Sequence, residues 1–127
     1  MSEEKKLTVL AVDDDFINLK LLNSILKRSG KVSEVIEKKN GQEAIEVLKA
    51  RGNEIDIILL DIIMPVMGGL EMLQIVRADE NLHQMPIIVL TTDETKKSEA
   101  LEFGANGFLM KPVREKDVIA KIDQLMI

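Results

Sequence analysis

The sequence predicts an α/β fold in which a doubly wound sheet of five parallel strands is flanked by five helices. Short apolar runs alternate with segments whose apolar residues recur at helical spacing, and this alternation occurs five times. Glycine, proline or asparagine stands near most boundaries between these segments. The length of 127 residues fits one domain, residues 1–127, without an evident linker or repeat.

The first half of the chain contains three predicted strands and two predicted helices. The strands are 7–12, 32–36 and 55–60, and the helices are 16–29 and 41–51. Gly30 is placed to end the first helix, and Asn40 is placed to cap the second. The run 55–60 is almost continuously apolar, which is typical of a strand covered on both faces.

The second half contains two predicted strands and three predicted helices. A helix follows the loop marked by Pro65 and Gly68 and ends near Ala78. The strands are 87–90, opened by a proline, and 107–110, and the remaining helices are 94–103 and 113–126.

The composition argues against several classes of protein. The net charge of −5 disfavours a nucleic-acid surface, and the three phenylalanines, without tryptophan or tyrosine, disfavour a face that stacks single-stranded bases. The absence of cysteine excludes disulfides and thiolate metal sites. No apolar run approaches the roughly 20 residues of a membrane span, and the first six residues have no apolar signal core. We therefore expect a soluble, cytoplasmic protein with no membrane partner.

Polar residues stand where the predicted strands end. They are Asp13, Asp14 and Asp15 after the first strand, Asp61 after the third, Thr91 and Thr92 after the fourth, and Lys111 after the fifth. In an open parallel sheet, ligands bind outside the carboxyl ends of the strands, so these residues should converge. Carboxylates that lie close together raise each other's pKa unless a cation joins them. A hard dication with oxygen ligands, Mg2+, is the expected cation.

Each of these residues also has a structural interpretation. Asp14 or Asp15 could simply cap the helix that follows. Lys111 alone could be a solvated side chain, and Thr91 alone a hydroxyl at a strand end. Asp61 is harder to explain in this way, because it lies within apolar sequence where a plain surface carboxylate is unexpected.

Four segments together resemble the response-regulator receiver domain of two-component signalling, over the whole length of the chain. The segments are LAVDDD (10–15), LLDIIMPVMGG (59–69), PIIVLTT (86–92) and GANGFLMKP (104–112). The second segment combined with the final Lys-Pro is a specific signal, whereas an acidic pair alone is weak. The resemblance implies a flavodoxin-like (βα)5 fold and a chemotaxis-regulator-like phosphoprotein.

The resemblance also implies a role for individual residues. Asp61 would accept a phosphoryl group from a histidine kinase or a histidine phosphotransfer protein. Asp13 and Asp14 would hold Mg2+ together with Asp61 and the backbone carbonyl of Ile63. Lys111 would contact the acceptor carboxylate and then the phosphoryl oxygens. Such a chain is a signalling phospho-acceptor and no ordinary enzyme, since it catalyses only its own Mg-dependent phosphorylation and dephosphorylation.

A switch is implied in the same way. Thr91 resembles the switch hydroxyl, Phe108 the aromatic residue that changes rotamer, and Pro112 the proline after a cis peptide bond. Phe108 could alternatively be an ordinary core aromatic. The surface formed by residues 95–126 would bind a downstream protein. Thr92 departs from the family pattern, because a small alanine is frequent at this position.

The first helix leaves two interpretations open. Its apolar residues span more of the circumference than one core-facing stripe needs, with Leu21, Leu22 and Ile25 at the centre and Phe16 and Ile17 at the margin. They could form a wide core or an exposed patch that docks a histidine-bearing helical partner.

Two other functions remain as alternatives. A phosphatase that forms an aspartyl phosphate, as in haloacid-dehalogenase-like proteins, typically has a second aspartate two residues after the nucleophile, where this chain has Ile63. A pseudo-receiver would lack some of the acidic, hydroxyl and lysine residues that are present here. His83, the only histidine, lies in a polar stretch and is expected in a surface loop. Ile127 directly follows the last helix, so the chain is expected to be either a single-domain regulator or the receiver part of a longer one.

Overall fold

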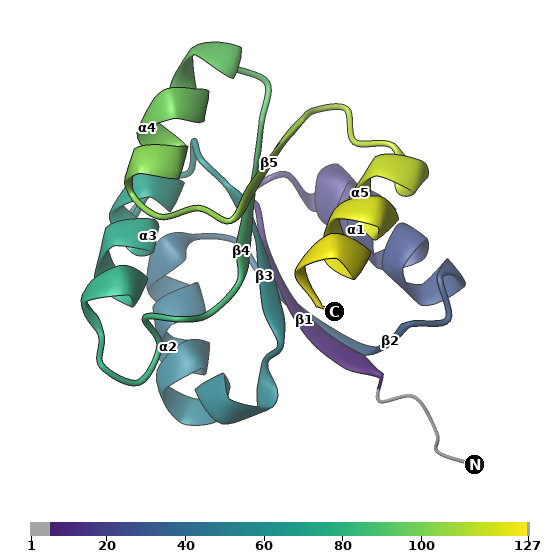
Figure 1. The fold of residues 1–127 in the computed structure, drawn as a ribbon, viewed down its shortest axis with the longest axis horizontal. Helices are drawn as coiled ribbons and strands as arrows, with labels where there is room; N and C mark the ends of the chain where they lie inside the picture. The colour runs from purple at the N-terminus through teal and green to yellow at the C-terminus, as the bar shows by residue number, and fades with distance from the viewer. Residues whose placement is uncertain (1–5, 127) are drawn as a thin grey trace.

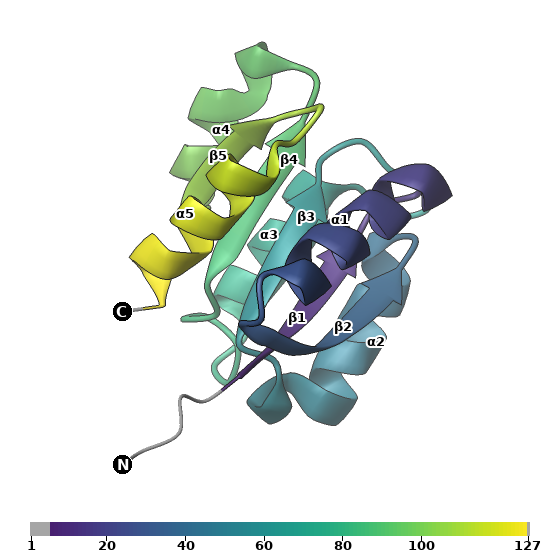
Figure 2. The ribbon, with the colours of Figure 1, turned by 90° about the vertical axis from the view of Figure 1, so that its right-hand side faces the viewer.

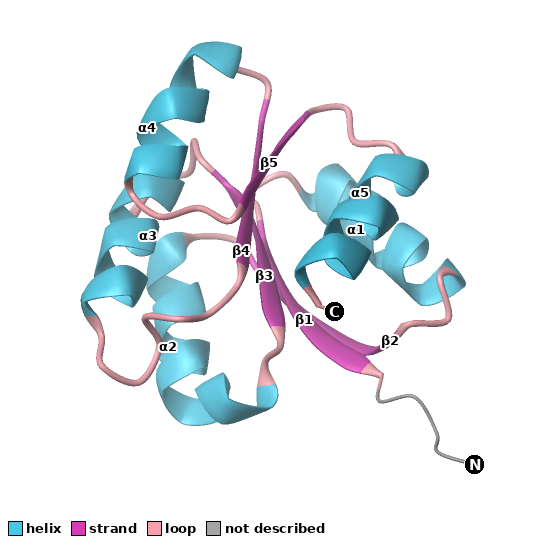
Figure 3. Cartoon of the chain, viewed as in Figure 1, coloured by secondary structure: helices cyan, strands magenta, loops and turns pink. Residues whose placement is uncertain are grey.

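The structure is a computed structural model that describes residues 6–126. Five parallel strands form one sheet in the order β2-β1-β3-β4-β5, and helices cover both of its faces (Figures 1 and 3). The strand order reverses between β1 and β3, and in open α/β sheets ligands bind outside the carboxyl ends of the strands at such a point. The predicted fold class is therefore confirmed.

The strands and helices lie close to their predicted positions. The strands are β1 (Leu7–Val12), β2 (Val32–Lys38), β3 (Ile57–Asp61), β4 (Ile87–Thr91) and β5 (Gly107–Met110). The helices are α1 (Phe16–Arg28), α2 (Gly41–Arg51), α3 (Gly69–Ala78), α4 (Lys97–Glu102) and α5 (Glu115–Leu125). Short 3-10 helices occupy Gly52–Glu54 and Glu94–Lys96.

The sheet separates two apolar cores. Helices α2, α3 and α4 cover one face, and α1 and α5 cover the other (Figures 1 and 2). Successive residues of β3 alternate between these cores: Ile58 and Leu60 contact the first, whereas Ile57 and Leu59 contact the second. All four are fully buried, and each contributes about 1.5–3 kcal/mol of hydrophobic free energy. This explains the continuous apolar run.

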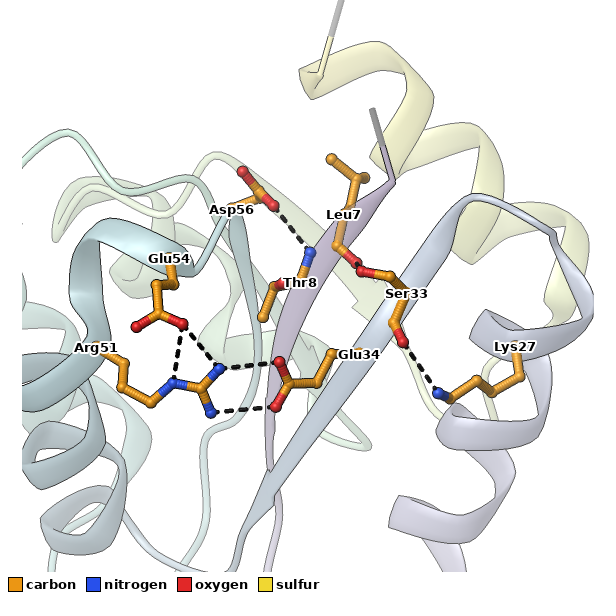
Figure 4. Close-up of polar contacts among 8 residues, drawn as sticks. All are labelled: Leu7, Thr8, Lys27, Ser33, Glu34, Arg51, Glu54 and Asp56. Carbon is orange, nitrogen blue, oxygen red and sulfur yellow. Dashed lines mark hydrogen bonds and ion pairs between the residues drawn. The ribbon is translucent and has the colours of Figure 1, made fainter. Parts of the chain in front are cut away.

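Several boundaries differ from the prediction by one or two residues; β2, for example, ends at Lys38 instead of residue 36. β3 begins at Ile57 instead of residue 55, and Asp56 just before it accepts a hydrogen bond from the Thr8 backbone N–H at 2.8 Å (Figure 4). The predicted helix 94–103 divides into a 3-10 turn and α4, of which only Ala100 is buried. The last helix begins two residues later than predicted, at Glu115.

Charged side chains connect strand β2 to the end of helix α2. The Arg51 guanidinium donates to both carboxylate oxygens of Glu34 on β2, at 2.9 and 3.1 Å, and to Glu54 (Figure 4). Because these groups are partly exposed, the ion pairs contribute modestly to stability.

Helix α1 carries an exposed apolar patch, as the second of its two interpretations predicted, and does not form a wide core. Leu19, Leu22, Ile25 and Leu26 are the residues that it buries. Phe16 and Ile17 are 66% and 78% exposed, and Leu21 is 39% exposed instead of lying at the centre of the buried stripe. Among residues 6–126, no helix is long and apolar enough to cross a membrane.

Candidate functional site

The site lies at the carboxyl edge of the sheet, where the ends of four strands meet. Asp61 and Thr91 are the last residues of β3 and β4, and both are buried. Asp13 and Lys111 come directly after β1 and β5. Val12 pairs with Leu60 in the ladder between β1 and β3, so the main chain places Asp13 beside Asp61.

Three carboxylates form a cluster of the size that a dication needs. Asp13, Asp14 and Asp61 each offer one oxygen, and these oxygens lie within 4.8 Å of one another. Oxygens on opposite sides of an octahedral Mg2+ are about 4 Å apart, so small side-chain adjustments would suffice. Asp13 and Asp61 are buried, whereas Asp14 is exposed and leaves the cluster open to solvent. The chemistry of these donors therefore fits Mg2+.

Lys111 lies between the two buried carboxylates. Its Nζ is 2.8 Å from Asp13 Oδ2 and 3.2 Å from Asp61 Oδ1. Burial lowers the pKa of Lys111, but the hydrogen bonds and charges of Asp13 and Asp61 outweigh this effect, and its pKa lies above the ordinary value. Lys111 is therefore a permanent cation of the site.

Asp61 retains an unfavourable environment despite this cation. Burial, together with the negative charges of Asp13 and Asp14, raises the pKa of Asp61 to about 6, against the opposing effect of Lys111. The carboxylate is thus ionised at neutral pH but at a cost in free energy. Its negative charge is therefore not fully compensated, and an added cation would supply that compensation.

Asp13 is held by more donors than the sequence indicated. Its Oδ1 accepts from the Asp15 backbone N–H at 2.9 Å, and its Oδ2 accepts from the Asn18 side-chain amide at 2.5 Å. Asp15 itself caps α1, as its structural interpretation predicted, by accepting from the Ile17 N–H at 2.9 Å. Sequence reasoning missed Asn18; the only signal was a polar residue in the first turn of a largely apolar helix.

The loop between β3 and α3 packs tightly against Asp61. The Gly69 N–H donates to the Ile62 carbonyl at 2.7 Å, and a Cβ at Gly69 would lie 2.2 Å from the Asp61 carbonyl oxygen. Val66 in this loop has a φ of 67°, in the left-handed region that a β-branched residue rarely adopts. Its side chain is 81% exposed, so no core packing offsets the strain.

The loop after β4 is closed by its own side chains. Thr91 Oγ1 accepts from the Asp93 N–H at 3.1 Å, and Asp93 Oδ1 accepts from the Thr95 N–H at 3.0 Å. The Lys111 N–H donates to the Thr91 carbonyl at 2.8 Å. Thr91 and Lys111 are thus joined through the main chain, while Thr92 is exposed beside them.

The remaining predicted residues occupy different environments. Phe108 is partly buried against the core of the α2–α4 face, and Lys97 Nζ lies 6.0 Å from its ring centroid, so it is neither a fully buried core aromatic nor a surface residue. The peptide bond between Lys111 and Pro112 is cis, as predicted. Ile63 is 62% exposed, and the role of its carbonyl stays a prediction. His83 is exposed, also as predicted.

Comparison with known proteins agrees with the resemblance to a receiver domain that the sequence motifs indicated. Residues 9–123 match the family model of the response regulator receiver domain. Two-component response regulator 24 of Arabidopsis thaliana is 34% identical over 96% of this chain and 86% of its own length. Hybrid signal transduction histidine kinase M of Dictyostelium discoideum is 36% identical over 93% of this chain but only 5% of its own. The chain thus spans under a fifth of several longer relatives.

Solved structures give a similar result. The chemotaxis response regulator CheY4 of Vibrio cholerae has a TM-score of 0.83 at 33% identity, and the match covers 95% of this chain and 99% of that one. A chain from the CheX–CheY–BeF3–Mg2+ complex of Borrelia burgdorferi has a TM-score of 0.86 at 27% identity, over 95% of this chain and 90% of that one.

Proposed function

The chain belongs to the response regulator receiver domain family of two-component signalling, and from that premise we propose that Asp61 accepts a phosphoryl group from a phosphohistidine. The donor would be a histidine kinase or a histidine phosphotransfer protein. The observation that carries the proposal is the buried Asp61 carboxylate at the end of β3, with Lys111 at 3.2 Å and an open acidic cluster beside it.

The reaction follows from the groups present. An Asp61 oxygen attacks phosphorus, the bond from phosphorus to the donor imidazole nitrogen breaks, and an acyl phosphate forms on Asp61. Lys111 is placed to neutralise charge on the phosphoryl oxygens, and the Thr91 hydroxyl to donate a hydrogen bond to them. Asp13, Asp14, Asp61 and the Ile63 carbonyl would hold Mg2+, which supplies further neutralisation of this charge. The CheX–CheY–BeF3–Mg2+ complex of Borrelia burgdorferi supports this chemistry by analogy.

Docking of the donor is supported by the exposed apolar patch of α1, formed by Phe16, Ile17 and Leu21. This patch directly follows the acidic cluster in the chain, so a helix that covers it would bring its histidine toward Asp61. The downstream partner would be a protein that binds the surface of residues 95–126, where Thr91 and Phe108 transmit the change. Neither a nucleic acid nor a membrane is proposed as a partner of residues 1–127, which act as a single receiver domain.

The two alternatives are weaker. A phosphatase of the haloacid-dehalogenase type would need an acid two residues after Asp61, and Ile63 has an exposed apolar side chain. A pseudo-receiver does not explain why Asp13, Asp61 and Lys111 are in contact.

Intact-mass spectrometry with acetyl phosphate and Mg2+ tests the proposal. We expect one phosphoryl group per chain, dependent on the divalent cation. Asp61→Asn should abolish the addition, whereas Asp79→Asn should not, because an amide oxygen can still accept the Asn81 N–H that Asp79 binds. Undiminished labelling of Asp61→Asn would refute the assignment of the acceptor.

A further inference from the structure

The donors around Asp13 differ in kind between its two carboxylate oxygens. Asp13 Oδ2 accepts from two side chains, the Asn18 amide at 2.5 Å and the Lys111 ammonium at 2.8 Å. Asp13 Oδ1 accepts from a backbone group, the Asp15 N–H, at 2.9 Å. The carboxylate is 1% exposed, so its orientation is set by these three donors and the surrounding chain.

The position of Asn18 on α1 explains how its amide reaches Asp13. Asp15 caps α1, which places Asn18 in the first turn, and helical side chains lean back toward the amino terminus. The Asn18 side chain therefore extends toward the loop that carries Asp13. Asparagine is a poor helix former, and its place in this turn is not explained by propensity.

We propose that Asn18 is a positioning residue that fixes Asp13 as a ligand for the divalent cation, an inference that rests on the proposed function. Lys111 cannot keep a close contact with Asp13 once a dication is bound there, because the two positive charges repel. Asn18 carries no charge and can keep its hydrogen bond. Asn18 is thus the side-chain donor that holds Asp13 in both the metal-free and the metal-bound protein.

Lys111 also contacts the second buried carboxylate of the site. Its ammonium lies 3.2 Å from Asp61 Oδ1 in addition to its contact with Asp13. When a bound dication displaces Lys111 from Asp13, Lys111 keeps its contact with Asp61. Its ammonium group then lies beside the proposed phosphoryl acceptor. A second-sphere hydrogen bond that orients a ligand typically changes metal affinity by a factor of 10–100, so the contribution of Asn18 is measurable.

The test compares Asn18→Leu and Asn18→Ala with Asn23→Leu. Leucine has nearly the shape of asparagine without a donor, and alanine gives a second variant that favours the helix. Asn23 is the matched control, since it lies on the same helix and its amide donates at 2.8 Å to Glu37, away from the acidic cluster. Mg2+ affinity is measured for the parent and the three variants by calorimetric titration, and folding by urea unfolding.

We expect both Asn18 variants to bind Mg2+ roughly tenfold more weakly than the parent, and Asn23→Leu to bind it unchanged. Phosphoryl labelling of the Asn18 variants should return to the parent rate at saturating Mg2+, which a general structural defect would not allow. Equal Mg2+ affinity of the parent and the Asn18 variants, or equal weakening in Asn23→Leu, would overturn the assignment of Asn18 alone. A parent chain that binds no Mg2+ would overturn the metal site of the proposed function, and this inference with it.

Discussion

Replacing Asp61 by asparagine should stabilise the metal-free protein at neutral pH. The pKa of Asp61 is raised from the ordinary value of 3.8 to about 6, so the folded protein binds this proton more tightly than the unfolded chain does. Stability therefore falls as the pH rises from about 4 to about 6 and stays reduced above that range. Asparagine resembles the protonated carboxyl and removes this loss.

The magnitude follows from the pKa shift. A shift of about two pKa units corresponds to about 3 kcal/mol at 1.36 kcal/mol per unit, which is an upper limit because the site is open to solvent through Asp14. We expect Asp61→Asn to raise the free energy of unfolding by about 1–3 kcal/mol near pH 7 and to have little effect near pH 4. The pH dependence distinguishes this effect from improved packing, which would act at both pH values.

Urea unfolding in a chelating buffer, followed by far-UV circular dichroism, measures this difference. Circular dichroism suits the chain because it contains no tryptophan or tyrosine for fluorescence. Asp79→Asn is again the matched control and should leave the profile unchanged. If Asp61→Asn is no more stable than the parent near pH 7, or if its advantage is as large near pH 4, the Asp61 charge does not destabilise the folded protein as described.

Three further predictions concern the cation, the strained turn and the switch. Mg2+ at about 100 times its dissociation constant should stabilise the parent by about 2.7 kcal/mol in urea unfolding, and the double variant Asp13→Asn, Asp14→Asn should gain far less; an equal gain would place the cation elsewhere. Val66→Gly should raise the free energy of unfolding by roughly 1 kcal/mol, because glycine tolerates the φ of 67°, and an unchanged unfolding midpoint would contradict the strain. Thr91→Ala should still be phosphorylated, but amide chemical shifts with beryllofluoride should no longer change across residues 95–126; full shifts in the variant would remove Thr91 from the switch.

The fold was largely predictable because burial leaves a clear pattern in this sequence. The five residues of β3 are all buried, and this doubly covered strand stands out as an apolar run. The start of β3 was not predictable, since it depends on a hydrogen bond from Thr8 to Asp56, 48 residues away. The exposure of Leu21 was missed for a similar reason: periodicity alone cannot distinguish a wide core from a patch.

The candidate site was predictable to a lesser extent. Asp13, Asp61, Thr91 and Lys111 could be placed together because parallel strands end at one edge of the sheet. The shared contact of Lys111 with both Asp13 and Asp61, and the amide of Asn18 on Asp13, depend on side-chain directions that spacing does not specify. The positive φ of Val66 could not be predicted from the sequence either, because a β-branched residue rarely adopts that conformation.

The pairing of Val12 with Leu60 has a consequence for how this chain can change over evolution. Main-chain hydrogen bonds between β1 and β3 fix the separation of the next residues, Asp13 and Asp61, whatever apolar side chains fill the two cores. A conservative core substitution should therefore alter the fraction of folded molecules and leave the geometry of the acidic pair intact. The core and the site can then accumulate mutations almost independently, with overall stability as the quantity they share.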